Sequence, residues 1–257
     1  MSILKILLPV LVLALAGLPA FAGEETTVDG VLHVKNGAKP EKGNEVIELE
    51  EVWRHGGEDD DEFFGMISQC VVGDDGTIYL LDTRMSEVPV YSPDGERLDT
   101  LSREGDGPGE VRIPSGLLFC PDGNLGIVQV FPGRVTKIAT DGTPVGVVTV
   151  GDATAGGFMQ MFDCVSDGKH LIVTAEKINP GEVQTQQGRV NFVAAFDGEG
   201  KEVTRFYENA FEWDFMNFTL DESELNRIDY RKVAAGKDGR IYIAAQPDAY
   251  HIDVYSP

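Results

Sequence analysis

The sequence contains few of the side chains that usually form metal centres, redox sites and cross-links. Only 3 cysteines and 4 histidines occur among its 257 residues. Three cysteines cannot all pair within one chain, and their spacing fits neither a zinc-binding pattern nor a C-x-x-C redox motif. The histidines stand singly, each on or beside an expected strand end or loop, and suggest no metal cluster. The residues concerned are Cys70, Cys120, Cys164, His33, His55, His170 and His251.

Basic residues are also scarce, and known catalytic signatures are absent. Lys and Arg number 21 against 43 Asp and Glu, which gives a net charge of −22. Nucleic acid and anionic lipid should be repelled by such a chain, so we expect neither as a partner. The charge could attract cations or basic partners, or only keep the surface solvated. No G-x-S-x-G, H-E-x-x-H or Ser/His/Asp signature occurs, although an active site can also assemble from separate repeats.

Long apolar runs are missing except at the N-terminus, which has the form of a secretory signal peptide. Lys5 supplies the positive charge, residues 6–18 form a short apolar stretch, and Ala20-Phe21-Ala22 is a small-x-small cleavage site. The stretch is shorter than the roughly 20 residues of a membrane span. An uncleaved anchor is the alternative. We expect a signal peptide over residues 1–22, a linker over 23–44, and a soluble periplasmic or secreted domain over 45–257.

The rest of the chain is organised as repeats. In each, an apolar strand leads to Asp-Gly, a second apolar strand follows, and often another Asp-Gly comes later. The first-turn glycines are 47, 45 and 71 residues apart, at Gly76, Gly123, Gly168 and Gly239. The second turns contain Asp94-Gly95, Asp141-Gly142 and Asp197-Gly198, and Val254-Tyr255-Ser256-Pro257 begins another.

This pattern predicts an all-β protein, a β-propeller of four-stranded blades. Asp-Gly between apolar runs is a hairpin signal, and two hairpins per repeat make four strands. Strands that are apolar on consecutive residues need cover on both faces, which neighbouring blades provide. A repeat of about 40–50 residues matches the propeller period. A β-sandwich with regular hairpins is the second choice. The cysteines fall just before the first turns, where they could form a disulfide between neighbouring blades or be small buried hydrophobes.

The 71-residue interval departs from the pattern because it holds an aromatic-rich segment, residues 206–229. Thr219-Leu220-Asp221-Glu222 has the form of a capping box, so a short helix is expected to run to about Arg227. The segment could be a binding loop on one propeller face, with its ligand contacts at Trp213, Phe215 and Phe218. Alternatively, Phe211, Trp213 and Phe215 turn inward and cover a blade.

The stretch 103–111, Arg-Glu-Gly-Asp-Gly-Pro-Gly-Glu-Val, resembles the six-bladed, NHL-like β-propellers of exported bacterial proteins, which carry Gly-x-Gly-Pro-Gly-Glu-Phe between blades. Residues 54–65 are similar to the family's acidic start of the first blade. The resemblance covers about residues 46–257 and implies an inter-blade turn at Gly105, Gly107, Pro108 and Gly109. Val111 stands where the family usually has an aromatic residue. Against the family's ring, the chain predicts three blades and part of a fourth, a truncated propeller, with residues 45–53 resembling a blade-closing strand.

Two ligand sites suggested by short motifs are weak. The glycine stretch lacks the Lys-Ser/Thr of a phosphate loop and precedes a strand rather than a helix, so we reject that reading. The acidic run 58–62 could bind Ca²⁺ through Asp59, Asp60 and Asp61. It lacks the spacing of a dedicated calcium loop, and we favour a solvated acidic turn over a calcium site.

The sequence therefore leaves two functions open. One is an exported binding or scaffold module for an unidentified protein or small-molecule ligand. The other is a propeller enzyme, a lactonase-like hydrolase or a lyase, with a metal at the channel centre and ligands from several blades. The fold by itself does not decide between them.

We predict cleavage after Ala22. Mass spectrometry of the exported protein should then find Gly23 at the N-terminus, because the small-x-small site ends there. Recovery of an intact Met1 from the exported fraction would contradict this expectation.

Overall fold

The structure is a computed structural model that describes residues 24–29, 31–35, 43, 45–57, 62–150, 158–181, 185–216, 232–244 and 251–256. The proposed leader (1–22), the acidic triplet Asp59–Asp61 and the helix expected from Thr219 to Arg227 lie outside these residues. Every regular element in the described part is a β-strand.

The strands form four antiparallel sheets. The first sheet contains β3 (Ile67–Val72), β4 (Ile78–Asp82), β5 (Val88–Tyr91) and β6 (Arg97–Leu101). The second contains β7 (Pro114–Phe119), β8 (Leu125–Gln129), β9 (Arg134–Ile138) and β10 (Pro144–Thr149). The third contains β11 (Phe158–Ser166), β12 (Leu171–Pro180), β13 (Gln186–Phe196) and β14 (Glu202–Asp214). The fourth runs in the order β1 (Glu24–Val28), β2 (Val31–Lys35), β17 (Asp253–Tyr255), β16 (Ile241–Ala244) and β15 (Lys232–Ala235).

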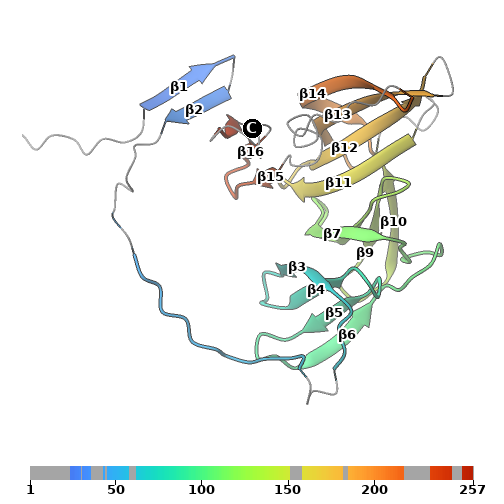
Figure 1. Cartoon of the computed structure of the whole chain (residues 1–257). Helices are drawn as coiled ribbons and strands as arrows, with labels where there is room; N and C mark the ends of the chain where they lie inside the picture. The colour runs from blue at the N-terminus through green and yellow to red at the C-terminus, as the bar shows by residue number, and fades with distance from the viewer. Residues whose placement is uncertain are drawn as a thin grey trace, which may run out of the picture.

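The sheets are the blades of a β-propeller. Their first strands, β3, β7, β11 and β15, contact one another in that order, so the sheets follow each other around a common axis. In Figure 1 they form an arc, with β6, β10 and β14 on its outer side. The all-β propeller predicted from the repeats is therefore confirmed.

The Asp-Gly turns explain how each hairpin closes. In the first turn the Gly76 N–H donates to Gly73 O at 2.9 Å, and Gly76 takes a positive φ of 85°. The Asp75 carboxylate accepts from the Thr77 N–H at 3.0 Å, which fixes the chain as it leaves the turn. Gly123 and Gly239 repeat this geometry. At Asp197-Gly198 the positive φ instead falls two residues later, at Gly200.

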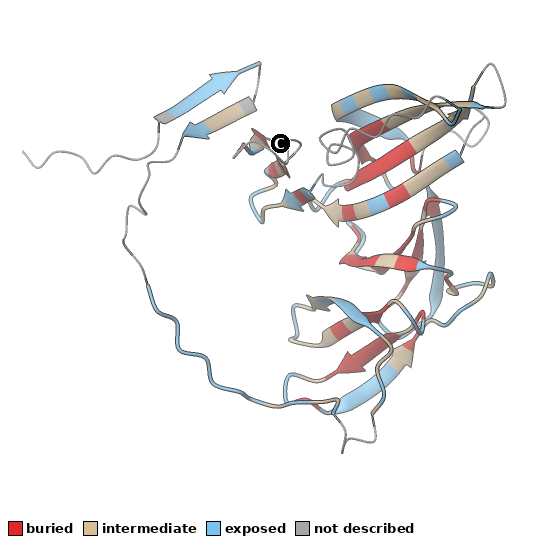
Figure 2. Cartoon of the chain, viewed as in Figure 1, coloured by how far each residue is buried: buried red, intermediate tan, exposed pale blue. Residues whose placement is uncertain are grey.

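Apolar side chains between consecutive sheets form the core. One cluster joins the first and second sheets, another the second and third, and a third the third and fourth. The five residues of β8 are all buried, as a strand covered on both faces requires. In Figure 2 the buried residues lie on the inner and middle strands. Two of the three cysteines, Cys120 and Cys164, belong to this core, whereas Cys70 is exposed, and all three are free thiols.

The N-terminal part differs from its prediction in two ways. Residues 45–53, expected to form a blade-closing strand, pair with no strand and run in an exposed, extended form past the open side of the arc (Figures 1 and 2). Within 23–44, expected to be a linker, β1 and β2 form a hairpin, and β2 pairs with β17 through Leu32↔Val254 and Val31↔Tyr255. The fourth sheet thus receives its outer strands from the N-terminus, which local patterns could not show.

The glycine-rich stretch lies between β6 and β7, where the chain passes from one sheet to the next. Glu110 folds back so that its carboxylate accepts from the Gly107 N–H at 2.8 Å and from Arg103 Nε at 2.7 Å. A Cβ on Gly105 would lie 2.0 Å from Glu110 Oε2, so a side chain there would displace the Glu110 carboxylate from this position. Val111 is fully buried in the core of the first two sheets.

A buried polar residue ends the second strand of the first two sheets. Asp82 is 2% exposed and accepts hydrogen bonds from the N–H groups of Gly65, Met66, Arg84 and Met85 at 2.6–3.0 Å. Gln129, 47 residues later, accepts from the Arg112 N–H at 3.0 Å. Burial by itself would raise the pKa of Asp82, but the four backbone donors outweigh burial and lower that pKa.

We expect Asp82→Asn to lower the free energy of unfolding by about 2–4 kcal/mol at neutral pH, because an amide nitrogen would then face backbone donors. The pKa of Asp82 is lower in the folded than in the unfolded state. Its contribution is therefore present above the unfolded value, about 4, and is lost as the pH falls through the folded value. Urea unfolding at neutral and acid pH should show the difference from the wild type shrinking in acid. Asp94→Asn, an exposed acid of the same sheet, is the control. Equal stabilities at neutral pH would contradict the assignment.

Candidate functional site

The third sheet is larger than the others and carries most of the aromatic segment. Its strands are 9, 10, 11 and 13 residues long, whereas those of the first two sheets have 4 to 6. Residues 206–214, interpreted from sequence as part of a loop, are instead the far end of β14. Figure 1 shows the longer strands of this sheet beside the shorter ones of its neighbours.

One face of this longer end is polar. The register aligns Glu176 with Asn191 across β12 and β13, and Asn191 with Asn209 across β13 and β14. Arg189 lies opposite Phe211 in the same way. Nearer the turns, the same face packs on the fourth sheet through apolar residues of its cluster, among them Ile172, Val193 and Ala195. The strands therefore change from an apolar to a polar inner face as they extend.

Arg189 is the centre of this polar face. Its guanidinium donates to Glu176 Oε1 at 3.0 Å and to Gln187 Oε1 at 3.3 Å, and its Cζ lies 4.9 Å from the centre of the Trp213 ring. Glu176 is 1% exposed. The two charges compensate each other in a largely buried position, and the indole adds a cation–π contact.

Beside this pair lie neutral polar groups whose hydrogen-bonding capacity is unused. Asn191 is fully buried, and neither Oδ1 nor Nδ2 of its amide has a hydrogen-bond partner in the described structure. Thr174 is 2% exposed, and its hydroxyl likewise has no hydrogen-bond partner in the described structure. A buried polar group without a partner costs about 1–3 kcal/mol and is rare in native proteins. We therefore regard Thr174, Glu176, Arg189, Asn191 and Trp213 as the candidate site, named below the polar end.

The residues predicted from sequence are only partly brought together. Trp213 belongs to the polar end, and its ring centre is 6.3 Å from that of Phe215, which is 49% exposed. Phe218 and the candidate calcium ligands Asp59, Asp60 and Asp61 lie outside the described residues. The glycine stretch is elsewhere, beside a cavity of about 310 Å³ between the inter-blade turn and β10. Thr174, Glu176, Arg189 and Asn191 were missed because they lie within strands that looked merely structural.

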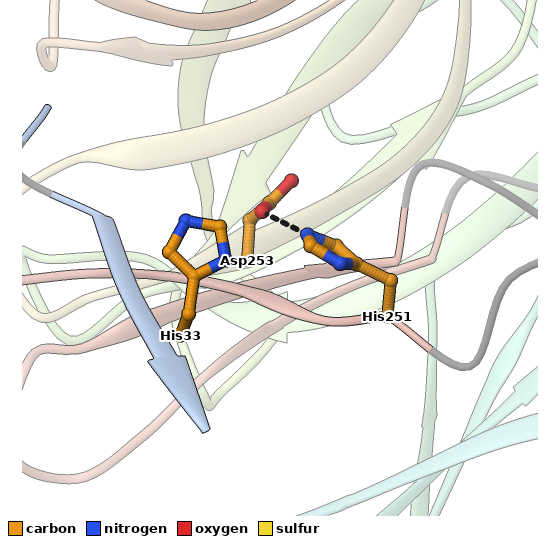
Figure 3. Close-up of side chains that lie close together, drawn as sticks. All are labelled: His33, His251 and Asp253. Atoms are coloured by element: carbon orange, nitrogen blue, oxygen red, sulfur yellow. Dashed lines mark hydrogen bonds and ion pairs between the residues drawn. The ribbon is translucent and has the colours of Figure 1, made fainter. Parts of the chain in front are cut away.

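Two of the histidines lie together, which the sequence did not suggest. The sequence suggested single, scattered residues, but β2 and β17 bring His33 and His251 together with Asp253 (Figure 3). One ligand atom from each lies within 4.8 Å of the others. A separation of 218 residues between the histidines gave no local signal for this group.

Among the comparisons with known proteins, only the one with solved structures found matches. No protein-family model and no curated protein sequence matches the chain. Among solved structures, a Bacteroides fragilis protein described as exported aligns over 79% of this chain with a TM-score of 0.52 and 11% identity. A Lactobacillus plantarum protein aligns over 88% (TM-score 0.43, 16% identity), and a Xanthomonas campestris gluconolactonase over 89% (TM-score 0.44, 15% identity).

The chain spans 53%, 61% and 66% of the lengths of these three proteins. The Bacteroides fragilis protein, with a TM-score of 0.52 at 11% identity, is similar to this chain in fold alone. No helix among the described residues is long and apolar enough to cross a membrane.

We expect Trp213→Ala to lower the free energy of unfolding by about 1–2 kcal/mol, the scale of one cation–π contact with partial burial. Trp213→Phe keeps an aromatic ring beside Arg189 and should lose less. Thermal and urea unfolding of both variants measure the effect. A loss of about 3–5 kcal/mol for the alanine variant would make Trp213 a core residue and remove it from the candidate site.

Proposed function

We propose that this chain is an exported β-propeller that binds a small, uncharged polar ligand at the polar end of its third sheet. The leader pattern supports export. The fold supports binding, because propellers present loops and strand ends around an axis where ligands dock. Several described side chains with complementary chemistry, an amide, a hydroxyl and an indole, lie together on one face of this sheet.

The buried amide of Asn191 carries the proposal. It offers two donors and an acceptor, none of them used by the described protein groups. A ligand with hydroxyl or amide groups would satisfy it, and the Thr174 hydroxyl could take part. An uncharged ligand fits because Arg189 and Glu176 already compensate each other at 3.0 Å. An anion would also meet the repulsion of a strongly acidic protein.

We expect Asn191→Leu to abolish ligand binding while leaving the free protein as stable as the wild type, or about 1 kcal/mol more stable. The exchange removes an unsatisfied buried amide at similar side-chain volume. Thr174→Val should likewise weaken ligand binding without lowering the stability of the free protein. Thr136→Val is a matched control, since Thr136 is 1% exposed and its hydroxyl is likewise without a described partner, but it lies on β9 of the second sheet.

Binding can be followed by fluorescence because the chain has 2 tryptophans. Trp53→Phe leaves Trp213 as the reporter, and a panel of neutral saccharides and polyols supplies the ligands. A compound that changes this signal should lose its effect in the Asn191 and Thr174 variants and keep it in the Thr136 variant. If Asn191→Leu destabilises the free protein by more than about 2 kcal/mol, the amide is a structural group and the proposal fails.

A further inference from the structure

The junction between β2 and β17 joins segments from opposite ends of the described chain. Two residue pairs connect these strands, Leu32↔Val254 and Val31↔Tyr255. Continuing this antiparallel register places His33 opposite Asp253. His251 lies two residues before Asp253, just outside β17, and its ring faces His33 and Asp253 (Figure 3). The pairing of β2 with β17 therefore brings the three side chains to one face of the junction.

The three side chains converge. His251 Nε2 lies 2.6 Å from Asp253 Oδ1, and the His33 and His251 ring centres are 5.3 Å apart at an interplanar angle of 66° (Figure 3). All three residues are partly buried, with 40% of the His251 side chain and 23% of the Asp253 side chain exposed. The imidazole of His33 makes no hydrogen bond within the described structure, although it faces two other ligand groups.

The structure assigns to this group a site for a transition-metal dication of the Zn²⁺ class. Two imidazoles and a carboxylate suit zinc, copper or nickel better than calcium or magnesium, which prefer oxygen ligands. With bonds of about 2.0–2.1 Å, tetrahedral coordination needs ligand atoms about 3.3 Å apart. The present separations, from 2.6 Å to no more than 4.8 Å, bracket that value. Side-chain movements of about 1 Å would complete three protein ligands, with water as the fourth.

A bound ion would also have a structural effect on the β2–β17 junction. It would cross-link the N-terminal hairpin to the fourth sheet where only two residue pairs now connect them. Because a metal binds the assembled site and not the separated strands, it would stabilise that junction. This inference depends on the fold and is independent of ligand binding at the polar end.

We expect the purified protein, freed of metal by chelation, to bind one Zn²⁺ saturably in isothermal titration calorimetry near pH 7.5. Co²⁺ in its place should give the visible absorption bands of a tetrahedral site. His33→Gln, His251→Gln and Asp253→Asn should each weaken the affinity by at least about 10-fold, since even changes outside the ligand shell have effects of that size. His170→Gln is the matched control, because His170 pairs with Asp167 in the turn between β11 and β12, away from this junction.

Hydrogen exchange supplies a second measurement. Zn²⁺ should slow exchange of the backbone amides of β2 and β17 in the wild type and in His170→Gln, but not in the three ligand variants. His251→Gln is the ligand variant that should disturb folding less than Asp253→Asn, because the His251 side chain is more exposed than that of Asp253. No saturable binding by the wild type, or equal binding by wild type and all ligand variants, would overturn the assignment. Binding of Ca²⁺ as strong as that of Zn²⁺ would also overturn it.

Discussion

The constraint on which the structure depends is the burial of apolar strands on both faces. Strands such as β8, buried at every residue, cannot face water on either side. A single sheet cannot satisfy them, whereas stacking around an axis gives the second and third sheets a neighbour on each face. The three clusters between consecutive sheets are the direct result. Buried polar groups such as Asp82 and Gln129 are tolerated because they cap backbone N–H groups of the segments that precede the inner strands.

The third sheet shows where this constraint relaxes. Its strands extend beyond those of the first two sheets, and on the extension the face that packs on the fourth sheet becomes polar. The charges of Glu176 and Arg189 compensate each other, while Asn191 and Thr174 remain buried without described hydrogen-bond partners. Such an arrangement costs stability and therefore calls for a reason other than folding. A ligand that uses these groups is the reason that our proposal offers.

The N-terminal hairpin is attached differently from the other strands. It joins the fourth sheet through a short junction, and the chain between it and the first sheet contains exposed apolar residues, including Val46, Ile47 and Leu49. The His33, His251 and Asp253 side chains meet at this junction. A metal there would cross-link the two strands locally. The contacts between the other sheets depend instead on burial of apolar side chains.

The repeat, the Asp-Gly turns, the all-β propeller and the inter-blade position of the glycine stretch could all be predicted from the sequence. These features depend on backbone geometry and side-chain patterns within a few tens of residues. Trp213 was proposed as a ligand contact from its local composition. Three features became visible in the folded chain alone: residues 206–214 extend a sheet, β2 rather than 45–53 joins the fourth sheet, and Asn191 is buried beside Arg189. Folding also brought His33 to His251, because pairing between distant strands depends on the whole packing and leaves no mark on the neighbouring sequence.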